Sequence, residues 1–344
     1  MKALWSSGFR PFFLLGACYG PFALALNLAA HALQWPLGEA VLVLGHAHEL
    51  LYGFATATAC GVLLTALPSW TGAAEVRGAR LATLVALWLA GRLAWWLGAW
   101  LPQGLVFGLD CAFFPVLLLM VLPTIRGARK RLFLWTLPPL LGLAAGNLLV
   151  HLAMLHGDVE QARFGIALGL HSFMFMFSLY AGLLTPAFTR GWLQSRGEPS
   201  HAILPPLEYA TALAMVLFAA ADLTQASAGW MVAACALIPT LRPDAWIHLF
   251  TLGALGMCKV GLMTRVVLRH TGRALIAPPW MKVAFAMMLG ATLLRLAFTV
   301  HHLSDVALAL SALLWSLAFM LYLLCFAGML VRPSLPRPAR AARP

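Results

Sequence analysis

Ten apolar stretches run through this chain, and the connections between most of them are short and polar. A helix that crosses a bilayer needs about 20 apolar residues, and each stretch approaches or exceeds that length. The sequence therefore predicts an all-α, polytopic transmembrane helix bundle. The predicted spans are residues 9–33, 42–67, 80–101, 104–123, 132–154, 162–189, 205–222, 245–268, 279–300 and 305–331.

The composition leaves no room for a sizeable soluble domain. Only 10% of the 344 residues are charged, against roughly 25% in a soluble globular protein. The first apolar stretch is too long for a signal-peptide core, so we expect it to remain as a span. We predict a single transmembrane domain over 1–331 and a disordered, Pro/Arg-rich tail over 332–344. No clear internal repeat is visible in the sequence.

The basic residues predict an orientation rather than a nucleic-acid partner. The net charge is +12, but most Lys and Arg residues cluster in alternate loops, and such loops stay on the cytoplasmic side. The segment 228–241 is apolar but short for a span. If it does not cross, the chain has ten spans and both termini are cytoplasmic. If it crosses, there are eleven, and the later basic clusters fall outside, so we favour ten.

One polar patch interrupts the second apolar stretch. It contains His46, His48, Glu49 and Tyr52, and ionisable groups inside a membrane segment are functional suspects. On an ideal helix His46 and His48 point about 200° apart, so we expect them to serve different partners unless the helix start is unwound. Each is a candidate haem or copper ligand. Glu49 either orients a histidine or pairs with an arginine, and Gly53 leaves space for a macrocycle or a close helix.

The predicted topology gathers other polar side chains in the outer half of the bundle with this patch. We expect Glu49 and Asp110 to be the partners of Arg92 and Arg295, because isolated ions in a membrane are costly. The pair of Arg92 and Asp110 is better explained as structural than as catalytic. Trp95, Trp96 and Trp100 predict an aromatic belt at an outer helix end. The other predicted members of the outer group are His31, Asn147, His151, His248, His301 and His302.

The opposite end of the span at 245–268 is basic. Arg265, Arg269 and Arg273 surround His270 there. The simpler interpretation is topology anchoring with lipid headgroup contact. The alternative is an anion site, for example for a haem propionate.

Several motifs, taken together and in order, resemble the NnrS family over nearly the whole chain. They are Ser7-Gly8-Phe9-Arg10-Pro11-Phe12-Phe13, His46-Ala47-His48-Glu49 followed by Gly53-Phe54, Leu63-Leu64-Thr65-Ala66-Leu67-Pro68-Ser69-Trp70-Thr71-Gly72, Asn147 with His151, Thr185-Pro186-Ala187-Phe188-Thr189, and Met263-Thr264-Arg265 with His270-Thr271-Gly272-Arg273.

This resemblance implies a protein of the bacterial inner membrane that binds haem b and copper and is linked to nitric oxide metabolism and nitrosative-stress resistance. The chain departs from the family pattern in three places. It is shortened between about 226 and 244, it has Leu183 where the family tends to have arginine, and it has Arg269 where the family has glycine. The shortening fits the loss of a pair of spans.

The expected function is therefore a haem-binding membrane protein, with copper as a second metal, that acts on nitric oxide or protects against it. The expected partners are lipid and nitric oxide, with no nucleic acid. The rival functions are a transporter or channel that uses the same polar group, and an assembly protein whose polar residues only join helices. The expected metal ligands are His46, His48 and His248, with His151 and His270 as further haem candidates. The expected supporting residues are Glu49, Tyr52, Arg92, Asp110, Asn147, Arg265, Arg273 and Arg295.

Overall fold

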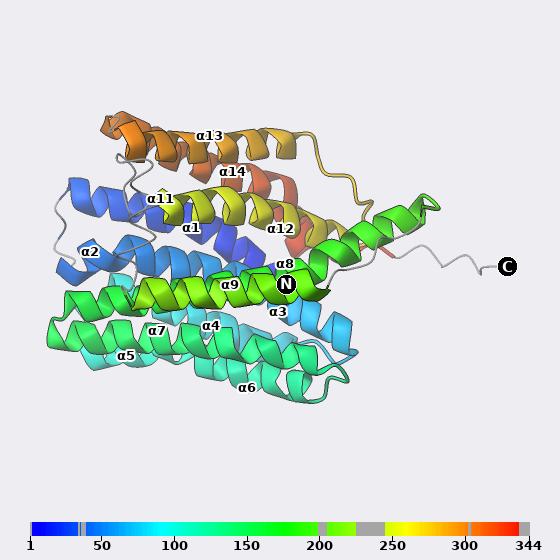
Figure 1. The fold of residues 1–344 in the computed structure, drawn as a ribbon, viewed down its shortest axis with the longest axis horizontal. Coiled ribbons are helices and arrows are strands. Elements are labelled where there is room, and N and C mark those ends of the chain that lie inside the picture. Colours follow the sequence, from blue (N-terminus) through cyan, green and yellow to red (C-terminus); the bar gives the residue numbers. More distant parts are fainter. Residues whose placement is uncertain are drawn as a thin grey trace. The chain divides into compact units, whose positions relative to one another are not determined.

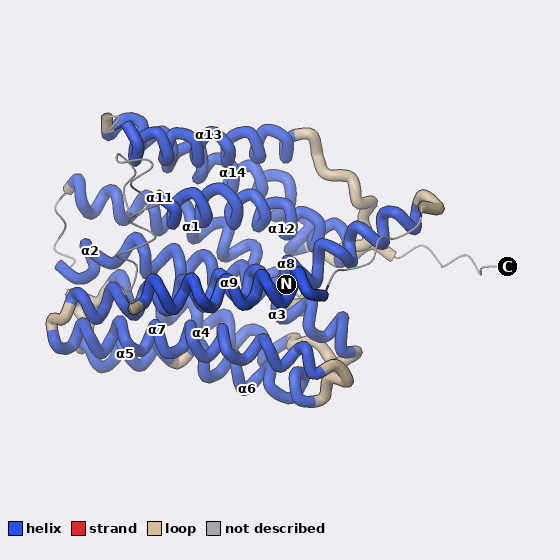
Figure 2. Tube along the Cα trace, viewed as in Figure 1, coloured by secondary structure: helices blue, strands red, loops and turns tan. Residues whose placement is uncertain are grey.

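A computed structural model of the chain describes residues 2–33, 35, 39–198, 205–224, 245–301 and 304–336 (Figure 1). Throughout these residues the regular elements are helices, as Figure 2 shows. In lipid the backbone can hydrogen-bond only to protein, and a helix satisfies nearly all its groups within one segment. The predicted all-α fold is thereby confirmed for this part of the chain.

Eight described helices are long and apolar enough to cross a membrane. The two further predicted stretches, 80–101 and 205–222, also form helices, α4 and α9. The number of spans and the side on which the termini lie stay predictions, and the segment 228–241 lies outside the described residues. The eight candidate spans are Phe9–Ala32, Leu44–Thr71, Gln103–Arg126, Arg131–His156, Val159–Gly191, Ala245–His270, Trp280–Thr299 and Asp305–Val331.

The chain divides into two compact units. Unit 1 is Met1–Asp110 with Leu237–Pro344, and unit 2 is Cys111–Ala236. The elements that begin in unit 1 are η1 (Leu4–Ser6), α1 (Phe9–Ala32), α2 (Glu39–His48), η2 (Glu49–Ala55), α3 (Thr56–Thr71), α4 (Gly78–Trp96), α5 (Gln103–Cys111), α11 (Ala245–His248), η5 (Leu249–Leu255), α12 (Gly256–His270), α13 (Trp280–His301) and α14 (Asp305–Val331). Those of unit 2 are α6 (Phe113–Arg126), η3 (Arg131–Thr136), α7 (Leu137–His156), α8 (Val159–Ser195) and α9 (Pro205–Leu223).

In unit 1, α1 packs against α3 and α14, and α13 runs along α14 (Figure 1). Aromatic rings fill the space between these helices. The ring of Phe54 meets Trp315 and Phe319 edge to face, with ring centroids 5.1 and 5.0 Å apart. A Cβ atom added at Gly20 would lie 2.8 Å from Phe54 and 2.9 Å from Trp315, so this close approach of α1 requires glycine.

Arg10 ties the first helix of unit 1 to the end of the last one. Its Nη1 donates to the carbonyl oxygens of Met329, Leu330 and Arg332 at 3.2, 2.8 and 2.7 Å. Its Nη2 donates to Ser334 Oγ at 2.9 Å. The last carbonyl groups of a helix have no partner within the helix, so the buried guanidinium caps the C-terminus of α14.

The end of α12 contacts the same segment after α14. Arg10, this segment and the end of α12 together are called the clamp below. Ser334 Oγ donates to the carbonyl of His270 at 3.1 Å, and the Leu335 N–H donates to the carbonyl of Thr271 at 2.9 Å. Gly272 has φ +74° and faces the Leu335 carbonyl, a conformation that favours glycine. Two of the motifs recognised in the sequence, one at Arg10 and one at His270-Thr271-Gly272, therefore meet the same short segment after α14.

Unit 2 is built on a helical hairpin in which α7 and α8 pack along each other, with α9 against α8. The turn between α7 and α8 contains residues that typically end one helix and begin the next. Gly157 has φ +69° after α7, and Asp158 caps α8 by accepting from the Gln161 N–H at 2.9 Å. A Cβ atom at Gly165 would lie 2.8 Å from the carbonyl of Gly146, so the two helices touch at backbone distance.

Candidate functional site in unit 1

The second candidate span changes its helical form at the polar patch. It is α-helical up to His48, a π-helix over the seven residues Glu49–Ala55, and α-helical again from Thr56. π-Helical turns are rare and frequently occur at functional sites. The patch therefore lies on a local irregularity that the apolar pattern does not reveal. The rings of His48 and Tyr52 still share a face and lie 4.9 Å apart.

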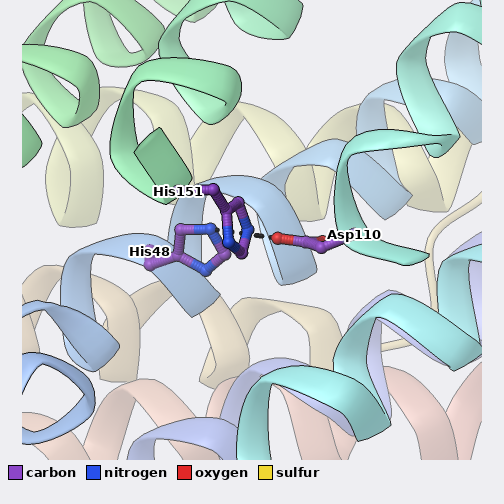
Figure 3. Close-up of side chains that lie close together, drawn as sticks. All are labelled: His48, Asp110 and His151. Carbon is purple, nitrogen blue, oxygen red and sulfur yellow. Dashed lines mark ion pairs between the residues drawn. The ribbon is translucent and has the colours of Figure 1, made fainter. Parts of the chain in front are cut away.

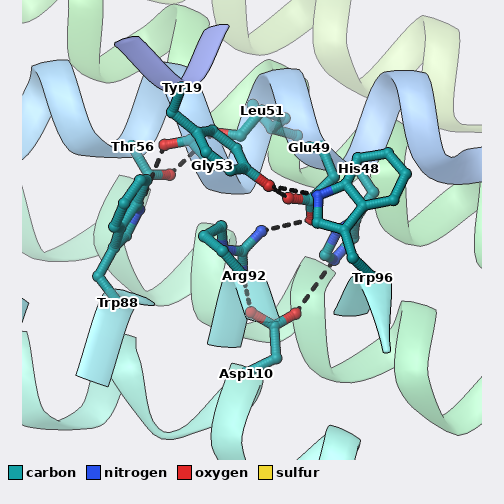
Figure 4. A network of polar contacts seen from close by, with 10 residues as sticks. All are labelled: Tyr19, His48, Glu49, Leu51, Gly53, Thr56, Trp88, Arg92, Trp96 and Asp110. Atoms are coloured by element: carbon teal, nitrogen blue, oxygen red, sulfur yellow. Dashed lines mark hydrogen bonds and ion pairs between the residues drawn. The ribbon is translucent and has the colours of Figure 1, made fainter. Parts of the chain in front are cut away.

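Glu49 begins the π-helix and collects three donors in the interior of unit 1 (Figure 4). Its Oε1 lies 2.8 Å from His48 Nδ1 and 2.6 Å from Arg92 Nη1. Its Oε2 accepts from the hydroxyl of Tyr19, which in turn accepts from Trp96 Nε1 at 2.9 Å. A carboxylate with this many donors is held in one position.

Asp110, on α5, closes the network from the other side. Its Oδ1 pairs with Arg92 Nη2, and its Oδ2 lies 3.3 Å from His48 Nε2, the pair drawn as a dashed line in Figure 3. Arg92 thus bridges two carboxylates, and His48 places one ring nitrogen on each of them. All four side chains are buried. Within this network the guanidinium faces two carboxylates, so each of these buried ions has a partner of opposite charge.

Two tryptophans of α4 complete the surroundings of His48. Its ring stacks on Trp95 with centroids 3.6 Å apart and planes 7° apart. The predicted aromatic belt is wrong for two of its three members, because Trp95 and Trp96 are 1% and 8% exposed whereas Trp100 is 64% exposed. The buried pair belongs to the polar network. Its indole rings orient His48 and, through Trp96 Nε1, Tyr19.

Gly53 serves close helix packing rather than a macrocycle. A Cβ atom there would collide with the ring of Tyr19 and lie 3.4 Å from Arg92 Cδ. The Gly53 carbonyl also accepts from Trp88 Nε1 at 3.3 Å. Of the two uses expected for this glycine, the structure supports the approach of neighbouring side chains.

His46 has neighbours different from those of His48, as the helical geometry predicted. It interacts electrostatically with His31, His248 and Arg295. Arg295 Nη2 lies 3.0 Å from His248 Nε2 and 3.4 Å from its Nδ1. Arg92 therefore pairs with both carboxylates that were expected to be shared between the two arginines. Arg295 instead contacts the imidazole of His248.

The surroundings of His248 repeat the form of those of His48. His248 directly precedes a second seven-residue π-helix, η5, as His48 precedes η2. In each case an arginine of the next long helix reaches the histidine or its neighbour, Arg92 from α4 and Arg295 from α13. Unit 1 therefore contains two helix pairs of the same build, a repeat that the sequence reading missed. The sequence does contain a signal of this repeat, because a histidine is followed at the same spacing by two glycines in both segments. The residues are His48, Gly53 and Gly61 in the first segment and His248, Gly253 and Gly261 in the second.

The other predicted residues belong to α7 and to the end of α12. Asn147 and His151 are buried on α7 of unit 2. His270 ends α12 in the clamp, where its ring lies 5.7 Å from Phe9. Arg265 is on α12, and Arg273 Nη1 donates to the Thr271 carbonyl at 3.4 Å. Tyr19, on α1, was not predicted, because nothing in its apolar surroundings marks it.

The donor set around His48 suits a metal ion. Imidazole nitrogen and carboxylate oxygen both ligate divalent copper, and His48 Nε2 and Asp110 Oδ2 face each other in unit 1. The other ring nitrogen of His48 is held by Glu49. Such a carboxylate fixes the tautomer and orientation of a ligating histidine. The group formed by His46, His248 and Arg295 offers two further imidazoles and a cation.

A comparison with protein-family models gives a match. A family model described as NnrS protein matches residues 3–243 and, in a second segment, 228–334. Together the two segments cover essentially the whole chain. No curated protein and no solved structure matches it.

Proposed function

Because the chain belongs to the NnrS family, we propose that it binds haem b, with copper as a second metal, in the bacterial inner membrane. We further propose that it acts in nitric oxide metabolism or in protection from nitrosative stress. The observation that carries this proposal is the buried network of His48, Glu49, Arg92 and Asp110 inside apolar helices. Ionisable groups are expensive in a membrane and are retained there mainly for function.

Unit 1 contains two groups of candidate ligands, one around His48 and one around His46 and His248. We propose that each group binds a different metal. His48 Nε2 and Asp110 Oδ2 would hold copper, and Glu49 would keep the imidazole oriented. His46 and His248 would hold haem, for which His248 must give up its contact with Arg295. That arginine is then available to a propionate, whose planar carboxylate suits a guanidinium. His151 and His270 stay candidate haem ligands on sequence grounds alone.

Bound haem would supply the chemistry, since its iron can bind a diatomic ligand when one of the two histidines gives way. The side chains of this chain control the surroundings. Arg92 neutralises the carboxylates, Trp95 fixes the ring of His48, and the Tyr19 hydroxyl contacts Glu49. We also propose ten spans with cytoplasmic termini, which place these groups in the outer half of the bundle.

The visible spectrum of the purified full-length protein tests the proposal. After haem-replete expression we expect a Soret band that shifts when nitric oxide is added, and copper in metal analysis. His46→Ala and His248→Ala should lose the Soret band. His48→Ala should lower the copper-to-protein ratio and keep the haem. The matched control is His156→Ala, because His156 is exposed at the end of α7.

A colourless full-length protein that elutes as a folded species would contradict the proposal. So would a Soret band that all four variants retain. In either case a transporter or an assembly role would account better for the buried network, because neither needs a metal.

A further inference from the structure

Unit 2 contains a cavity between α8 and α9 that uses none of the residues discussed above. Its volume is about 320 Å³. Ligand pockets start at about this size, and the smallest ones suit a single ring system rather than a large macrocycle. The lining residues are His171, Met174, Thr211, Ala214, Met215 and Phe218.

His171 gives this cavity a polar side, and it pairs with Asp222, which does not itself line the cavity. His171 Nε2 lies 2.7 Å from Asp222 Oδ2, and the edge of the imidazole meets the ring of Phe218 at 5.5 Å and 72°. His171 is buried and Asp222 is only partly so. A carboxylate on one nitrogen holds the ring in a fixed orientation. An imidazole held in this way can form a hydrogen bond with a ligand oxygen, as donor or as acceptor.

The sequence of α9 builds the opposite wall. Thr211, Met215, Phe218 and Asp222 recur at three- and four-residue spacing, which places them on one face of the helix. His171 and Met174 share a face of α8 by the same rule. Thr211 and Ala214 are exposed, so the cavity is open on the side of α9. In a membrane-embedded helix that side is reached from the lipid.

We propose that this cavity binds the ring of a membrane-soluble quinone or quinol. Such a ring is flat, apolar on both faces and carries two opposed oxygen atoms. The thioethers of Met174 and Met215 and the ring of Phe218 match its faces. The pair of His171 and Asp222 matches one oxygen, as a donor to a carbonyl or an acceptor from a hydroxyl.

Other occupants fit less well. An acyl chain would use only the apolar lining of Met174, Met215 and Phe218 and could form no hydrogen bond with His171. A single metal ion would leave most of the volume unfilled. The inference does not depend on haem or copper, because it uses only residues of α8 and α9.

Titration of the purified full-length protein with decylubiquinone in detergent tests the inference. Ala214→Phe fills the cavity, and His171→Leu removes its polar group. Each should weaken binding at least tenfold. The matched control is Ala220→Phe, which adds the same ring to an exposed position of α9 that does not line the cavity. It should leave the Kd unchanged within twofold.

Two outcomes would overturn the inference. Equal affinity of the wild type and all three variants would mean that the quinone only partitions into the detergent micelle. Displacement by oleate of a bound lipid, with no binding of decylubiquinone, would identify an acyl-chain site. Haem content and thermal unfolding are measured on the same samples. Thermal unfolding shows whether each variant is folded. The haem content shows whether haem binding fails independently of quinone binding.

Discussion

Arg92 is the residue on which the buried charges of unit 1 depend. It contacts both Glu49 and Asp110, as His48 also does, and its guanidinium carries a fixed positive charge. The residue types of this network were predictable, because isolated ions in a membrane demand partners. The sequence could not predict which arginine pairs with which carboxylate, because that depends on how each helix is rotated about its axis. Tyr19 was beyond prediction for the same reason.

Replacing Arg92 by glutamine should therefore be strongly destabilising. Arg92→Gln leaves two buried carboxylates near one imidazole, and removing one partner of a buried ion pair costs about 3–5 kcal/mol. Thermal unfolding in detergent measures the loss. In the double variant Arg92→Gln/Asp110→Asn the loss should be smaller than the sum of the two single losses, because the residues share one network.

The control for this prediction is Arg163→Gln. Arg163 pairs with Glu160 at 2.7 Å, but both side chains are largely exposed, and exposed pairs contribute little. The apparent Tm of this variant should match that of the wild type. Equal Tm values for Arg92→Gln and the wild type would show that the buried network does not stabilise the fold.

At the scale of the element, the predicted spans agree with the helices to within a few residues at most ends, because an apolar run and its flanking charges mark where a helix can lie in a membrane. The π-helices after His48 and His248 were not predictable in this way. An added residue within a turn shifts the phase of an amphipathic pattern, but spans that are apolar on nearly every side have no such pattern to shift. The histidines that end the preceding α-helices and their spacing to the following glycines are present in the sequence, but the backbone shows what that spacing means.

Adding a methyl group within the first π-helix should disturb the network. In Gly53→Ala the new Cβ meets the ring of Tyr19, so the ring must move and its hydroxyl must leave Glu49. Overpacking of this kind costs about 1–3 kcal/mol. We expect a lower Tm and, if haem is bound, an altered visible spectrum.

Gly108→Ala is the matched control for this change. Gly108 lies within α5 and has no atom near the position of an added Cβ. Alanine there should stabilise the helix by about 0.5–1 kcal/mol. If both glycine variants shift the Tm in the same direction, the close contact at Gly53 is not what constrains that position.

At the scale of the whole molecule, the loop charges predict an orientation that the fold itself leaves undetermined. Every predicted stretch forms a helix, yet a helix bundle has no feature that distinguishes the two sides of a membrane. The distribution of Lys and Arg does distinguish them. The division into two units also had no signal in the sequence, since both units have the same apolar composition and short connections.

A reporter fused after Pro344 tests the orientation. With ten spans and a cytoplasmic amino terminus, a green fluorescent protein fusion should fluoresce, and an alkaline phosphatase fusion should be inactive. The matched pair of fusions after Gly157, in the loop between α7 and α8, should give the opposite result. An active phosphatase after Pro344 would indicate an odd number of spans.

The clamp at Arg10 has a consequence for how the protein is made. Arg10 is synthesised 319 to 324 residues before its acceptors at Met329, Leu330, Arg332 and Ser334. Until those acceptors have been made, the guanidinium must remain solvated at the membrane surface, because its burial without them is too costly. A truncated chain that stops before α14 can never bury it. The clamp thus distinguishes chains in which α14 has been made and has folded from chains in which it has not.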